Sequence, residues 1–156
     1  MGLYNFKARF VPLIESGAKT HTIRELRKYP SKAGDALYLY EGLRTKCARR
    51  ILVTECIAVQ PIEVYRRIAA AVDVPAVIEF GVRIAGQDLA GDEIEAFARR
   101  DGFRNFDEMI GFWREQKRRF PWHGHVIHWR FPPDAPLEPI TPRARLAARH
   151  AIRSHR

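Results

Sequence analysis

The segment from Gly17 to Arg24, with the sequence GAKTHTIR, gathers residue types that could do chemistry. It follows a stretch that predicts a short helix, and the partial negative charge of a helix C-terminus favours Lys19 just beyond it. If the next residues are extended, Thr20, Thr22 and Arg24 point to one face. Two hydroxyls and a guanidinium would then lie beside an amine. Such a set can bind a phosphate or a carbonyl oxygen, or activate a hydroxyl nucleophile if the pKa of the lysine is lowered. A structural surface strand is the alternative.

The net charge favours a polyanionic partner. The 156 residues include 27 Lys+Arg and 18 Asp+Glu, a formal charge of +9, and nucleic acid is the usual partner of so basic a chain. A general enrichment in arginine is the alternative explanation. Between Lys19 and Arg50, nine cations face three carboxylates, which leaves a net +6. We therefore expect RNA contacts from this region, made by Thr20, Arg24, Arg27, Lys28, Arg44, Lys46 and Arg49. The ring of Tyr40 could stack on a base, with core packing as the alternative.

Several other classes of protein are excluded. No run of 18 apolar residues predicts a membrane span, and the N-terminal residues lack the apolar core of a secretory signal. Two cysteines indicate neither a disulfide scaffold nor a zinc site. No glycine-rich phosphate loop is present. Among the late histidines, His123 and His125 would share a strand face while His128 points away. We expect a cytoplasmic protein with no cofactor and no metal.

The elements that must position these residues are mostly short. The pattern predicts a helix over 10–16 and strands over 20–24, 36–40, 49–60 and 125–131. Apolar residues at helical spacing predict a further helix over 62–72, followed by a bent strand or hairpin over 77–84. Two later helices have start signals at Asp92 and Asn105, and Gly102 between them can adopt the left-handed cap.

This order of elements predicts an α+β fold, in which a small mixed β-barrel has helices packed against it. A doubly wound parallel sheet would need regular strand–helix alternation, which is absent. Residues 1–131 form the predicted domain. Residues 132–156 are rich in proline and arginine, and we expect them to be a disordered basic tail.

The GAKTHTIR segment resembles the G-x-K-T-x-T-I-R signature of ASCH domains, which belong to the PUA-like superfamily. The similarity continues through 34–37 (GDAL), which resembles the G-D-x-L of that family, and through 40–45 (YEGLRT). The 98–103 segment (ARRDGF) is similar to the A-x-x-D-G-F of one branch, and 124–129 resembles its closing strand. The resemblance covers roughly residues 6 to 131, and the order of its motifs is fairly specific.

The resemblance implies a small barrel with a cleft lined by the signature. Members of the family include nucleic-acid-binding proteins, an RNA-cleaving enzyme and an amidohydrolase that acts on acetylcytidine. The amidohydrolase uses a lysine and a threonine of the signature and a later glutamate, which correspond to Lys19, Thr22 and Asp101. Aspartate in place of glutamate is a departure that sets the carboxylate about one methylene further back.

We therefore expect an ASCH-like protein that binds RNA, or a nucleoside derived from it, in a basic cleft. In the leading hypothesis it is a hydrolase, of a phosphodiester in single-stranded RNA or of the acetylcytidine amide. Thr22 would be the nucleophile and Lys19 the base, while Asp101 orients the amine. A non-catalytic RNA-binding module is the first alternative. An adaptor that binds an acidic protein is the second.

Overall fold

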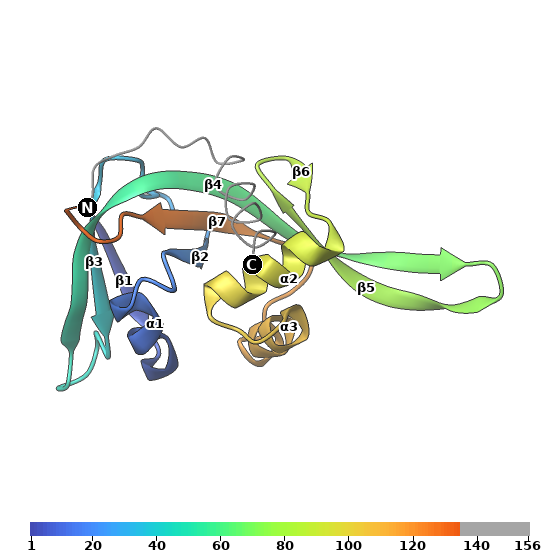
Figure 1. The fold of residues 1–156 in the computed structure, drawn as a ribbon, viewed down its shortest axis with the longest axis horizontal. Helices are drawn as coiled ribbons and strands as arrows, with labels where there is room; N and C mark the ends of the chain where they lie inside the picture. Colours follow the sequence, from blue (N-terminus) through green and yellow to red (C-terminus); the bar gives the residue numbers. More distant parts are fainter. Residues whose placement is uncertain (135–156) are drawn as a thin grey trace, which may run out of the picture.

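The computed structural model describes residues 1–134 and shows an α+β fold in which a large mixed sheet is combined with short helices (Figure 1). The strands are β1 (Gly2–Phe6), β2 (His21–Glu25), β3 (Ala36–Glu41), β4 (Arg49–Ala71), β5 (Val74–Ile84), β6 (Gln87–Asp88) and β7 (Trp122–Trp129). The helices are α1 (Val11–Glu15), which follows a 3-10 turn (Ala8–Phe10), α2 (Gly91–Asp101) and α3 (Phe106–Glu115). Within this part of the chain, no helix is both long enough and apolar enough to span a membrane.

The sheet is organised around β4, whose 23 residues arch across the molecule (Figure 1). Its first part is antiparallel to β3, its middle part to β7 and its last part to β5. At the ends of the sheet, β1 runs parallel to β3, and β2 is antiparallel to β7. Strand β4 thereby connects the part of the sheet formed by β1 and β3 to the part formed by β7 and β2.

The predicted β-barrel is not supported, because the sheet does not close. A barrel needs its two edge strands to pair with each other. Among the described strands, β1 pairs with β3 and β2 pairs with β7, and no backbone ladder joins β1 to β2. The side chain of Arg24 in β2 contacts β1 instead: its Nη2 donates to the backbone oxygen of Asn5 at 2.7 Å, and the guanidinium lies over the rings of Tyr4 and Phe6. The fold is therefore an open mixed sheet.

The helix predicted over 62–72 is wrong, because these residues continue β4. Ile62 and Val64 are buried at alternate positions, the period of a strand. Further along, Ile68 lies opposite Ile78 in the ladder to β5. The two strands form a long hairpin that projects from the body of the molecule (Figure 1). Its outer part contains the β-branched residues Ile68, Val72, Val74, Val77 and Ile78, and β-branched side chains favour strands over helices.

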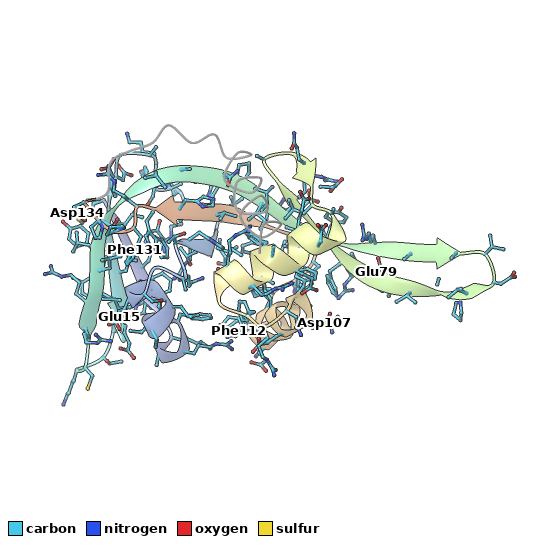
Figure 2. All side chains as sticks on the ribbon, viewed as in Figure 1. Glu15, Glu79, Asp107, Phe112, Phe131 and Asp134 are labelled. Carbon is cyan, nitrogen blue, oxygen red and sulfur yellow. The ribbon has the colours of Figure 1, made fainter. Side chains whose placement is uncertain are left out.

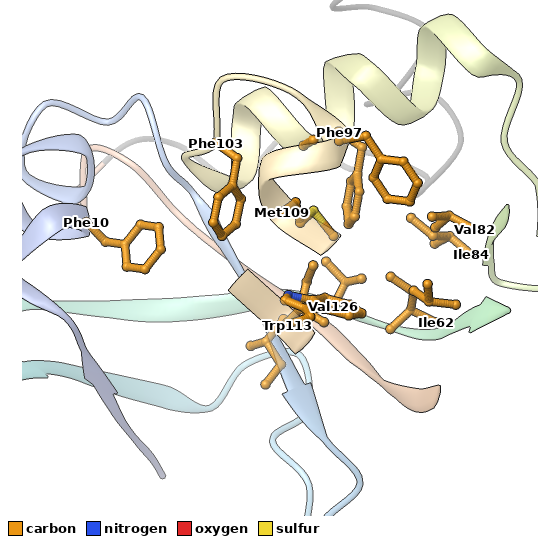
Figure 3. Packing of buried hydrophobic residues seen from close by; sticks show 14 of the residues in the cluster. Phe10, Ile62, Val82, Ile84, Phe97, Phe103, Met109, Trp113 and Val126 are labelled. Carbon is orange, nitrogen blue, oxygen red and sulfur yellow. The ribbon is translucent and has the colours of Figure 1, made fainter. Parts of the chain in front are cut away.

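Helices α2 and α3 cover the sheet and confirm the two helices predicted from the sequence. Phe97 of α2 and Met109 and Trp113 of α3 pack against Val126 of β7 in the hydrophobic core (Figure 3). Gly102 ends α2 with φ at 103°, the left-handed cap that its position predicts. The Asn105 side chain accepts a hydrogen bond from the backbone amide of Glu108 at 2.8 Å and caps α3. The end of α2 is thus fixed by its own sequence.

The closing strand predicted over 125–131 is β7, which begins earlier and ends at Trp129. The prediction of a disordered basic tail over 132–156 lies, from residue 135 onward, outside the described residues.

Candidate functional site

A cavity of about 210 Å³ lies where the start of the chain, β2, the end of α2 and the C-terminal part of α3 meet. Aromatic side chains form much of its wall, and three of them, Phe10, Phe103 and Trp113, are labelled in Figure 3. The aromatic Phe112 also lines it and projects from α3 on the side of α1 (Figure 2). Its volume is below the ~300–1,000 Å³ of sites for drug-sized ligands, so it suits one small ring system.

The polar lining of this cavity contains all three residues that the family resemblance singles out. They are Lys19, Thr22 and Asp101. Arg24, predicted from the charge pattern, lines it as well. These residues come from the turn before β2, from β2 itself and from the last turn of α2. The fold therefore brings together side chains that are about eighty residues apart in the sequence.

Lys19 is positioned by the tight turn that follows α1. Gly17 has φ at +77°, a left-handed conformation that favours glycine, and any larger residue there would also collide with the ring of Phe131. The backbone amide of Lys19 donates to the carbonyl oxygen of Leu13 at 2.9 Å. The chain then enters β2 at His21. This turn fixes the direction in which the lysine side chain leaves the backbone.

The central interaction of the site is a buried ion pair between Lys19 and Asp101. Only 3% of the lysine side chain and 9% of the aspartate side chain are exposed. The Lys19 ammonium donates to Oδ1 of Asp101 and also to its backbone oxygen, the latter at 2.7 Å. The ring centroid of Phe10 lies 5.1 Å from Nζ. Two donors of the ammonium are therefore held by one residue.

This pairing also explains how an aspartate can occupy the end of a helix. Asp101 is the last residue of α2, where the helix dipole disfavours an anion. Lys19 offsets this by contacting both the carboxylate and the terminal carbonyl. The ammonium therefore neutralises the two negative groups that meet at this helix end.

Burial and charge shift the pKa values of both partners. Burial lowers the pKa of Lys19, and the attraction of Asp101 only partly opposes this. For Asp101, burial alone would raise the pKa, but the charge of Lys19 and the close contacts of the carboxylate with His21 and Lys19 outweigh burial and hold the pKa below its usual range. Asp101 is thus an anion at neutral pH, while Lys19 loses its proton more readily than an exposed lysine does.

Sequence reasoning missed His21, which lies behind this pair. Its Nε2 is 3.3 Å from Oδ1 of Asp101, without a well-aligned hydrogen bond. Its ring stacks on Phe97 with the centroids 5.2 Å apart. Burial lowers the pKa of His21, although Asp101 opposes the shift, so the imidazole is neutral at pH 7. The histidine stood inside the signature, but nothing in the spacing indicated that it would face Asp101.

Thr22 is partnered by Arg24 and not by Lys19. Its hydroxyl oxygen accepts a hydrogen bond from Nε of Arg24 at 3.0 Å. Arg24 is itself half-buried and lies over the rings of Tyr4 and Phe6. Burial, followed by repulsion from Arg27, lowers the pKa of Arg24 to about 10, which leaves it charged at neutral pH. A fixed cation therefore polarises the Thr22 oxygen at the wall of the cavity.

The other residues predicted to contact RNA do not line this cavity. Thr20 is buried and Tyr40 is half-buried, whereas Arg27, Lys28, Arg44 and Lys46 are exposed. Arg49 forms ion pairs with Glu15 (3.1 Å), labelled in Figure 2, and with Glu41 (3.3 Å). Its charge is thus balanced by carboxylates.

Two further cations on the cavity wall, Lys7 and Arg118, were not anticipated. Lys7 lies over the ring of Phe112, 4.8 Å from the centroid. Arg118 lies 4.2 Å from the ring centroid of Trp113 and 4.5 Å from that of Trp122. Both residues belong to segments outside the basic cluster, so charge counting along the sequence could not have found them.

No cluster of three or more metal-ligating side chains exists among residues 1–134. Of the three histidines considered, His128 contacts Oε1 of Gln60 through Nε2 at 2.7 Å.

In the comparisons with known proteins, no family model matches the chain, and neither a curated protein nor a solved structure is significantly similar to it.

Proposed function

We propose that this protein is a hydrolase that binds a nucleoside of RNA, free or within a single strand, in the basic cavity beside β2. The observation that carries this proposal is the buried Lys19–Asp101 pair on the wall of a cavity that also holds the Thr22 hydroxyl. The resemblance of the GAKTHTIR segment to the ASCH signature adds to it. The small volume favours a substrate of which one base enters the cavity.

The arrangement supports acyl transfer from an amide such as that of acetylcytidine. A neutral Lys19 accepts the Thr22 proton as Oγ1 bonds to the acyl carbon, and the C–N bond breaks as the amine takes that proton. Water then cleaves the threonine ester and releases the acid. Because burial lowers the pKa of Lys19, its neutral form is easier to reach, while the charge of Arg24 stabilises negative charge on the Thr22 oxygen.

A non-catalytic binding module is the second candidate. It is favoured by the hydrogen bonding in the structure, where Lys19 donates to Asp101 and the Thr22 oxygen accepts from Arg24. A hydrolase would require the Thr22 proton to reach Lys19 once a substrate is bound.

Product analysis separates the two candidates. The purified chain is incubated with acetylcytidine and, separately, with single-stranded RNA, and nucleosides, acetate and RNA fragments are quantified. Equal release of cytidine and acetate supports the amidohydrolase, and shorter RNA supports a phosphodiesterase. Binding of either compound without any product would refute the hydrolase and leave the binding module.

A further inference from the structure

The cavity carries more positive charge than the proposed chemistry uses. Lys7, Lys19, Arg24 and Arg118 line it together with a single carboxylate, that of Asp101. Lys19 neutralises Asp101, so three cations are left on the wall. A cavity with such an excess attracts an anion.

Arg118 is the cation that most clearly lacks a counterpart. Its backbone amide donates to the carbonyl oxygen of Trp113 at 3.2 Å, but within residues 1–134 its side chain has no ion pair, and Nη1 is a buried donor without a partner. Its guanidinium is instead held against the rings of Trp113 and Trp122. Because no carboxylate among residues 1–134 is paired with the guanidinium, its positive charge is available to an anion in the cavity that Arg118 lines.

The guanidinium of Arg118 is also held in place before a ligand binds. Two indole rings restrict the planar guanidinium, which reduces the entropy lost when a ligand binds. Burial lowers the pKa of Arg118, and Glu25 and Asp101 oppose the shift by attraction at longer range. Guanidinium groups that are held in one orientation are suited to phosphate, which offers oxygen atoms in matching geometry.

We propose that Arg118, with Arg24 and Lys7, forms a phosphate subsite on the cavity wall, so that a nucleoside monophosphate binds here in preference to a nucleoside. The nucleoside part of this inference rests on the proposed function, whereas the phosphate subsite rests on the cation excess and on the position of Arg118. The subsite is distinct from the exposed cations predicted from the sequence, such as Arg27 and Lys28, which lie outside the cavity.

The test is calorimetric titration of the full chain with cytidine, cytidine monophosphate and inorganic phosphate. Loss of a charge-assisted hydrogen bond corresponds to about ten- to hundredfold in affinity. We expect the monophosphate to bind at least tenfold more tightly than cytidine in the wild type. In Arg118→Gln this preference should fall by about tenfold or more, because one of the three cations is lost, while the affinity for cytidine is unchanged, and Arg118→Lys should restore part of the preference.

Arg114→Gln is the matched control, because Arg114 also lies over an aromatic ring, that of Phe80 at 5.1 Å, but does not line the cavity. Equal affinities for cytidine and its monophosphate in the wild type would overturn the inference. So would an equal loss of both affinities in Arg118→Gln with an unchanged thermal midpoint. If no nucleoside or nucleotide binds but inorganic phosphate does so through Arg118, the phosphate subsite stands and the proposed function fails.

Discussion

The buried ion pair makes a quantitative prediction about stability. Removing one partner of a buried pair leaves the other charge uncompensated, at a cost of about 3–5 kcal/mol, whereas replacing both partners by apolar residues of similar volume is close to neutral. Lys19 and Asp101 meet the conditions for this, because both are buried and they contact each other directly. We therefore expect Lys19→Met and Asp101→Leu each to destabilise the protein by about 3–5 kcal/mol.

The double variant Lys19→Met/Asp101→Leu should lie within about 2 kcal/mol of the wild type, because both charges are then absent. Urea unfolding followed by tryptophan fluorescence measures this, since Trp113 and Trp129 are 2% and 1% exposed and report on the core. With a slope of ~1–3 kcal/mol per M, the single variants should unfold at a midpoint at least about 1 M lower. Single variants that each cost less than about 1 kcal/mol, or a double variant that costs their sum, would refute the reasoning.

Three further predictions follow from the same geometry. Burial lowers the pKa of Lys19, and we propose its neutral amine as the base. Turnover should therefore rise with pH and level off below the ordinary lysine pKa of about 10.4. A profile that is flat from roughly pH 6 to pH 10 would contradict this role for Lys19. In Lys19→Met, His21 becomes the group nearest to Asp101 that can carry a positive charge. The pKa of His21 in the folded protein should therefore rise above its value of about 6.5 in the unfolded chain. The stabilisation of Lys19→Met by protonated His21 is complete below the unfolded pKa and is lost as the pH increases through the folded pKa of His21. Unfolding curves of Lys19→Met that coincide at acid and alkaline pH would exclude this stabilisation by His21. Arg27→Ala should weaken RNA binding and reduce the slope of log affinity against log salt concentration by about one. Arg49→Ala should weaken RNA binding less, because Arg49 is already paired with Glu15 and Glu41. Equal losses of affinity in the two variants, measured by fluorescence anisotropy, would overturn that distinction.

The sequence predicted the parts of the site that are local. Local sequence predicts a helix that ends before a glycine, then a lysine, then a strand in which Thr22 and Arg24 share a face. The structure has all three. The two late helices were also predictable, because Asn105 and Gly102 are cap residues for local reasons.

What the sequence could not supply depends on contacts between distant segments. The apolar spacing of Ile62, Tyr65 and Ile68 fits a helix as well as a strand, and pairing with β5 decided between them. The closure of a sheet is likewise decided by which edge strands meet, and here β1 and β2 do not pair. The cation excess around Arg118 arises because separate segments converge on one cavity.

The central claim is that the Thr22 hydroxyl reacts, and its removal tests that claim most directly. Thr22 is a buried residue of β2, with 5% of its surface exposed. Thr22→Val keeps the shape and the β-branch of the side chain while removing the oxygen. The measurement is the rate of cytidine release from acetylcytidine, with the affinity for cytidine determined in parallel. We predict a loss of at least about a thousandfold in turnover with cytidine binding retained, and residual turnover in Thr22→Ser. Turnover by Thr22→Val at the wild-type rate would contradict the account.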